Sequence, residues 1–256
     1  MIGRVHAYGA GVVAGTAILL SAQFAAADSG GASSSGGAPV APTKTAPAPP
    51  LAPDGQVEAG NRVITASGNG ITITTHSSAL FRGRLRFTGH VSSPGTGRMI
   101  EIDRRGARGT WKPTLRTRIR AHGSFNATWA TNKSGRFAFR ASILRGKGQR
   151  ATSASSPTLT VIVYRMSIAT TYGPGFYGSQ TACGERLTRH TLGTANRTLK
   201  CGTRVAVLYH GRSIVVPVID RGPYANGANW DLTVATARKL GMDGTARIGA
   251  ASLSAR

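Results

Sequence analysis

Short runs in which apolar and polar residues alternate fill the chain from residue 61 to residue 165. Runs of period two, separated by turns rich in Gly, Ser and Asn, are typical of antiparallel strands with one buried face. The apolar positions of these runs are Ile71 and Ile73; Leu85 and Phe87; Ile100 and Ile102; Phe125, Ala127 and Trp129; Phe137, Phe139, Ala141 and Ile143; and Leu159, Val161 and Val163. Six or seven strands in this length predict an immunoglobulin-like β-sandwich. Trp111 and Trp129 either fill its core or serve as stacking platforms for sugars.

A second all-β unit is predicted after the sandwich. Two of its strands flank a turn at His210 and Gly211, as indicated by alternation of Val205, Val207, Ile214, Val216 and Val218. One short helix is expected over residues 234–240, because Thr233 is a good N-cap and Gly241 stands where a helix C-cap belongs.

The start of the chain has the pattern of a secretory signal, residues 1–27. Its apolar core, residues 10–20, is too short for a membrane span, which needs about 20 apolar residues. Small residues in an A-x-A arrangement favour cleavage before Asp28. Since the first cysteine is Cys183, no lipid attachment is expected near the cut. We therefore expect a secreted, extracytoplasmic protein with no membrane span or lipid anchor after signal cleavage.

A low-complexity segment of Gly, Ser, Ala, Pro and Thr follows, residues 28–60. It has little apolar surface to offset the entropy of ordering, and its Pro-rich half favours extended backbone. We predict a disordered linker, which serves either as a spacer or to reach across a cell wall. The folded units are then a sandwich domain, 61–165, and a C-terminal domain, 166–256.

Positive charge is concentrated in the predicted sandwich. The formal net charge of the chain is +23, and residues 61–165 hold 19 Lys and Arg against two acids, Glu101 and Asp103. Such a surface attracts polyanions. In an extracytoplasmic protein the expected partners are anionic wall polymers, whereas nucleic acid is not expected. The alternative is a general solubility role for scattered arginines.

Cys183 and Cys201 are the only two cysteines. In a compartment that permits disulfides, we expect them to form one; a metal site is the competing interpretation, but no CxxC or histidine spacing supports it. The same lack of ligand spacing leads us to expect no metal and no organic cofactor.

Four ordered blocks in the C-terminal domain resemble the rare lipoprotein A group of septal-ring lytic transglycosylases and, more distantly, the first domain of expansins. The blocks are ATTYGPGFYGSQTACGE (169–185), NRTLKCGTRVAV (196–207), SIVVPVIDRGPY (213–224) and WDLTVATARKLG (230–241). The resemblance implies a six-stranded double-psi β-barrel. It also implies cleavage of the MurNAc–GlcNAc bond of peptidoglycan, in which a hydroxyl of the muramic acid attacks its own anomeric carbon and no water is consumed. One carboxyl group, here Asp220, can then act as acid and afterwards as base.

Asp220 and Glu185 match acid positions of that family and are the predicted catalytic residues. Asp220 ends an apolar strand before the turn that begins at Arg221, where it either protonates a leaving oxygen or accepts hydrogen bonds from backbone amides of the turn. Glu185 would support it. Asp231, beside the predicted N-cap Thr233, is interpreted as structural.

The expected substrate-binding residues come from the same blocks. They are Tyr172, Phe176, Tyr177, Thr181, Asn196, Arg221 and Tyr224. Aromatic rings of the loop can pack on pyranose faces or simply close the end of the barrel. The sequence departs from the family at Asn196, where a histidine is common. An asparagine can bind sugar hydroxyls but cannot relay a proton.

Three functions are compatible with these patterns. The first is a lytic transglycosylase acting on peptidoglycan glycan strands. The second is a non-catalytic, expansin-like protein that binds the wall with the same groove, as the asparagine at position 196 favours. The third is a structural protein in which the basic sandwich binds polyanions and the barrel is passive.

Overall fold

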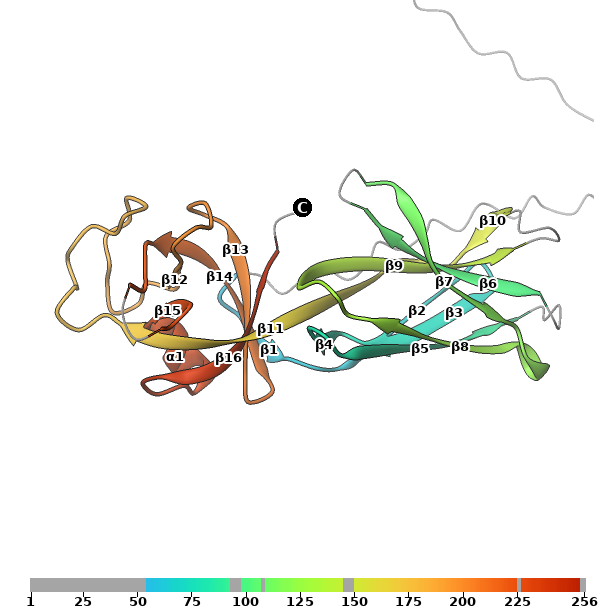
Figure 1. Ribbon diagram of the computed structural model, residues 1–256, viewed down its shortest axis with the longest axis horizontal. Coiled ribbons are helices and arrows are strands. Elements are labelled where there is room, and N and C mark those ends of the chain that lie inside the picture. Colours follow the sequence, from blue (N-terminus) through green and yellow to red (C-terminus); the bar gives the residue numbers. More distant parts are fainter. Residues whose placement is uncertain (1–53, 93–97, 107–108, 145–149, 225–226, 254–256) are drawn as a thin grey trace, which may run out of the picture. The chain divides into compact units, whose positions relative to one another are not determined.

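The computed structural model describes residues 54–92, 98–106, 109–144, 150–224 and 227–253 (Figure 1). The predicted signal sequence and most of the predicted linker lie outside these residues. Within the described ranges, no helix has the length and apolarity needed to cross a membrane.

The first domain contains two sheets, as the alternating pattern predicts. One is a four-stranded antiparallel sheet of order β2-β3-β5-β8. Its strands are β2 (Val63–Gly68), β3 (Ile71–His76), β5 (Arg84–Val91) and β8 (Ser124–Ala130). The facing sheet contains β4 (Ser78–Leu80), β6 (Met99–Arg105), β7 (Trp111–Arg118), β9 (Gly135–Leu144), β10 (Arg150–Ser155) and the first half of β11 (Leu159–Tyr172). A 3-10 turn, η1 (Ala121–Gly123), precedes β8.

The apolar side chains of both sheets form one core. Phe87 from β5 and Phe139 from β9 are fully buried, with ring centroids 4.9 Å apart. Trp129 packs edge-on against Phe139 at 5.0 Å. The core interpretation is therefore confirmed for Trp129. Trp111 is half-buried, with the Arg140 guanidinium 4.4 Å from its ring centroid.

The second domain is a closed barrel of six strands, which confirms the predicted fold. Around the barrel the order is β15-β12-β14-β13-β16-β11, and a parallel pairing between β11 and β15 closes it. The strands are the second half of β11, β12 (Thr194–Ala195), β13 (Arg204–Tyr209), β14 (Arg212–Asp220), β15 (Trp230–Thr233) and β16 (Ala246–Ser252). The turn at His210 and Gly211 joins β13 to β14 as predicted.

The one α-helix of the described ranges, α1 (Val234–Leu240), has the predicted caps. The Thr233 hydroxyl accepts a hydrogen bond from the backbone N–H of Thr236. Gly241 adopts the left-handed conformation, with φ of 73°, that glycine accommodates without a Cβ clash.

Two segments differ from the domain boundaries expected from sequence. Val57–Ala59, predicted to belong to the linker, form strand β1, which pairs with Arg212–Ile214 at the start of β14. That edge of β14 is open because the short β12 pairs only near residues 218–220. Likewise, β11 runs without interruption through the expected boundary at residue 165, and pairs with β9 before it and with β16 after it.

Candidate active site

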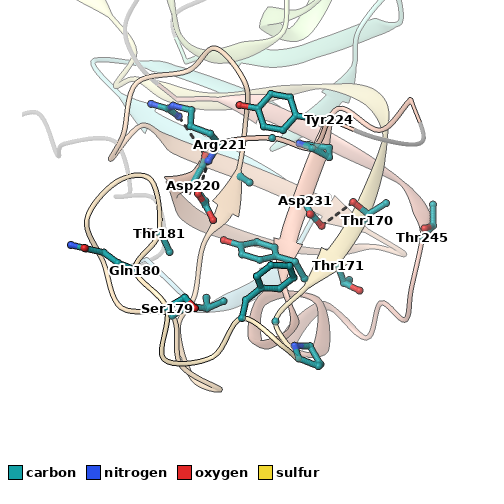
Figure 2. Close-up of a pocket in the computed structure, with 18 residues that line it drawn as sticks. Thr170, Thr171, Ser179, Gln180, Thr181, Asp220, Arg221, Tyr224, Asp231 and Thr245 are labelled. Carbon is teal, nitrogen blue, oxygen red and sulfur yellow. Dashed lines mark hydrogen bonds between the residues drawn. The ribbon is translucent and has the colours of Figure 1, made fainter.

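A cavity of about 710 Å³ lies beside the strands β11, β12, β14 and β15 of the barrel. Its walls also include the long loop after β11, through Phe176 and Gln180, and the turn after β14, through Arg221 and Tyr224 (Figure 2). Asp220 and Asp231 both point into this cavity. The cavity is thus lined both by carboxyl groups and by aromatic rings.

The strand register explains how the two carboxyl groups come together. Ala195 on β12 pairs with Asp220 on one side and with Asp231 on the other. Asp231 in turn pairs with Thr170 on β11. Since neighbouring strands are about 4.8 Å apart, the backbones of the two aspartates are separated by roughly 10 Å. The methyl group of Ala195 is the only side chain between them in this row, which leaves room for a substrate.

Asp220 is fixed by the surrounding backbone. Its Oδ1 accepts hydrogen bonds from the N–H of Ala182 at 2.9 Å and of Arg221 at 2.8 Å. The second contact is the turn interaction considered from sequence, and the first comes from the loop that carries Thr181. Because the side chain also lines the cavity, these contacts orient a group that faces the substrate.

Asp231 has a different environment. Burial raises the pKa of its carboxyl group above the ordinary 3.8, the hydrogen bond from Thr170 acts in the opposite direction, and the charge of Asp220 raises it further. The Thr170 hydroxyl donates to Asp231 Oδ1 at 2.8 Å. Asp231 is therefore a half-buried carboxyl group that retains a proton more readily than a fully exposed one.

Tyr172 adds a buried hydroxyl to this group. The Tyr172 Oη finds no hydrogen-bond partner among the described residues. Burial raises the pKa of this phenol, and the charges of Asp220, Asp231 and Glu185 raise it further. A buried polar group without a partner is costly, so this hydroxyl is suited to bind an incoming polar ligand.

Six of the nine residues predicted to act on or bind substrate line the cavity. They are Tyr172, Phe176, Thr181, Asp220, Arg221 and Tyr224. Phe176 is 59% exposed and Tyr224 79%, which is unusual for large rings and leaves their faces open to a ligand.

Glu185, Tyr177 and Asn196 do not line the cavity. Glu185 is exposed, and its backbone N–H donates to the Thr181 hydroxyl. The Tyr177 ring packs against Gly173. Asn196 caps a turn, because its Oδ1 accepts from the backbone N–H groups of Thr198 and Leu199.

Arg221 lines the cavity, but its guanidinium makes contacts elsewhere. Nη1 donates to the Asn196 carbonyl at 3.1 Å, and Nη2 donates to Cys201 Sγ at 3.2 Å. Cys183 and Cys201 form the predicted disulfide. Among the described residues, no group of three or more His, Cys, Asp or Glu side chains is arranged to hold a metal ion.

Three further residues that line the cavity, Asp231, Gln180 and Ser179, were not predicted as site residues from the sequence. A signal was present in the alternation of β15. Trp230 and Leu232 are buried in the barrel core, so Asp231 between them must face the other way. The helix cap that follows suggested a structural role instead.

The raised pKa of Asp231 predicts how stability depends on pH. The folded state keeps the Asp231 proton over a range of pH above 3.8 in which the unfolded chain has lost it, so this residue lowers stability as pH rises through that range. Asp231→Asn removes that penalty and keeps an acceptor for Thr170. Urea unfolding should give the variant a higher free energy of unfolding at about pH 7, and no advantage below about pH 3. An equal or lower value at pH 7 would contradict the buried-charge account.

Comparisons with known proteins agree with this geometry. A closed six-stranded barrel with two aspartates in a cavity is the arrangement that the predicted double-psi β-barrel requires. Residues 167–252 match the family described as lytic transglycolase. The resemblance inferred from the four sequence blocks is thereby confirmed.

Individual proteins are similar in sequence to part of this chain. The chain is 49% identical over 77 residues to a "Probable endolytic peptidoglycan transglycosylase RlpA" of Synechocystis, covering 29% of this chain and 24% of the relative. For the protein of the same name in Aquifex aeolicus the identity is 44% over 81 residues, covering 31% and 36%. The chain therefore spans only about a quarter to a third of the length of these relatives. Among solved structures, Streptomyces papain inhibitor is 25% identical with a TM-score of 0.29, covering 35% of this chain and 93% of that one.

Proposed function

We propose that this protein is exported to the cell wall, binds peptidoglycan glycan strands in the barrel cavity and cleaves them as a lytic transglycosylase. The observation that carries the proposal is the pair of aspartates flanking Ala195, in a domain that matches the lytic transglycolase family. The relatives named endolytic peptidoglycan transglycosylases support the substrate class.

The different environments of the two aspartates favour a division of roles. Asp231 holds a proton and donates it to the glycosidic oxygen as the bond from that oxygen to C1 of the muramic acid breaks. The C6 hydroxyl of the same sugar attacks C1, and its proton passes to the carboxylate of Asp220. The products are a 1,6-anhydro end and a new sugar hydroxyl, with no water consumed.

This assignment restricts Asp220, which was expected to act first as acid and then as base, to the role of base. Burial favours the protonated form of Asp231, whereas Asp220 supplies the neighbouring charge that raises the pKa of Asp231. Glu185, exposed outside the cavity, contributes negative charge that favours an oxocarbenium-like transition state. The Asn196 side chain acts as a turn cap in this scheme, since its Oδ1 accepts from Thr198 and Leu199.

The rim and wall of the cavity would hold the strand. The exposed rings of Phe176 and Tyr224 offer apolar faces to pyranose rings. Hydroxyl and amide groups of Tyr172, Gln180 and Thr181 line the cavity and can bind sugar hydroxyls. The basic sandwich would contact anionic wall polymers in the same compartment.

A second function is favoured by one observation. The position where the family commonly has histidine is occupied by Asn196, whose side-chain oxygen is committed to a turn. A barrel without this histidine would bind strands and leave them intact, as an expansin-like protein does.

Product analysis decides between cleavage and binding alone. Denuded glycan strands are incubated with the full chain and examined by mass spectrometry. New 1,6-anhydro-muramyl ends are expected. New reducing ends would indicate hydrolysis with water instead, and strand binding without new ends of either kind would establish the expansin-like function.

A further inference from the structure

The outer face of the sheet β2-β3-β5-β8 carries two continuous rows of polar side chains. The registers align Thr65, Thr74, Thr88 and Asn126 in one row, and Ser67, Thr72, His90 and Ser124 in the next. Hydroxyl groups touch across the strands, with 2.9 Å between the Oγ1 atoms of Thr65 and Thr74. The alternate residues of these strands face the core, so these rows lie on the opposite, solvent side of the sheet.

Two arginines extend this polar face along β5. Because side chains alternate along a strand, Arg84 and Arg86 project on the same side as Thr88 and His90, while Leu85 and Phe87 are buried in the core. Both arginines are exposed. Neither forms an ion pair within the part of the chain that the structure describes. From Arg84 to His90 the line of alternate side chains spans about 20 Å.

The acids of the sandwich lie on the other sheet. Residues 61–165 contain only Glu101 and Asp103, and both are buried on β6. Glu101 pairs with Arg116 at 2.8 Å, and Asp103 pairs with Arg140 at 3.4 Å. Arginines of that sheet are therefore partly neutralised, whereas an anion that approaches the β5 face meets no carboxylate on its strands.

We propose that this surface, defined by Arg84, Arg86 and the two polar rows, binds an extended phosphodiester polymer. This proposal specifies the contact with anionic wall polymers that is proposed above. It rests on the proposed location in the wall, but not on strand cleavage. Arginine binds phosphate oxygens through two parallel N–H donors, and Ser, Thr and Asn side chains donate to phosphate oxygens as well. The length of the line suits an extended chain better than a single small anion.

The test measures binding of the full chain to poly(glycerol phosphate) across salt concentrations. Arg84→Ser/Arg86→Ser is compared with Arg118→Ser/Arg136→Ser, which removes the same charge from exposed positions on β7 and β9 of the other sheet. We expect the first variant to bind at least about tenfold more weakly at low salt. The slope of the logarithm of its binding constant against the logarithm of salt concentration should be smaller in magnitude by about 1.4. Two phosphate contacts are lost, and each contributes about 0.7 to this slope. The second variant should change affinity less than about threefold.

Other outcomes would overturn the proposal. Equal losses in both variants would mean that overall charge, and not this face, attracts the polymer. Equally tight binding of a polycarboxylate such as polygalacturonate would exclude phosphate recognition. Failure of the wild type to bind poly(glycerol phosphate) would show that a phosphodiester polymer is not its partner. Circular dichroism verifies folding of each variant. Strand cleavage is measured separately, so a failure here leaves the proposed enzyme activity untouched, and the reverse holds as well.

Discussion

Replacing Asp231 by asparagine is expected to lower the rate of glycan-strand cleavage by about two to four orders of magnitude, the usual contribution of a general acid. The amide keeps the shape of the side chain and can still accept the hydrogen bond from Thr170, but it has no proton to give. Strand binding should persist, because the aromatic rim and the polar wall are unchanged. The measurement is the initial rate of anhydro-end formation, with strand affinity determined in parallel.

Matched variants make this result specific. Asp243→Asn removes a carboxyl group of the same domain that is exposed and lies outside the cavity, and it should leave the rate unchanged. Glu185→Gln should reduce the rate less than about tenfold, because the side chain is exposed and screened by solvent. If Asp231→Asn cleaves strands at the wild-type rate while Asp220→Asn does not, then Asp220 is the proton donor and the roles proposed here are reversed.

The sequence predicts those parts of the fold that depend on local patterns. Strand alternation places Phe87 and Phe139 in the sandwich core, and the residue types at Thr233 and Gly241 define both ends of α1. It does not predict β1, since Val57–Ala59 have the composition of a linker. Their order comes from the open edge of β14, a partner about 155 residues away.

The candidate site, too, could be predicted only where local sequence patterns define it. Asp220 is recognisable because a motif surrounds it. Asp231 becomes a cavity residue only when β12 lies between β14 and β15, a pairing across long loops that no local pattern encodes. Asn196 and Glu185 belong to the same motif blocks, yet the fold turns Asn196 to backbone amides and leaves Glu185 in solvent.

The disulfide is part of the structure that holds Asp220. It joins the loop at Cys183 to the turn at Cys201. Beside it, the N–H of Ala182 donates to Asp220 Oδ1, and the N–H of Cys183 donates to the Ile219 carbonyl at 3.2 Å. The bridge therefore restrains the loop that supplies one of the two backbone donors to the carboxylate.

Removing the bridge with Cys183→Ala/Cys201→Ala should lower the free energy of unfolding by about 3 kcal/mol, the chain-entropy value for a loop of this length, as measured by urea unfolding. Below the unfolding temperature we also expect kcat to fall at least about tenfold, because Asp220 loses a fixed donor. Phe87→Ala in the sandwich core is the matched control, since it costs about 3–5 kcal/mol without touching the loop, and its kcat should be that of the wild type. A disulfide-free variant that is folded and cleaves strands at the wild-type kcat would show that the loop holds its position without the bridge.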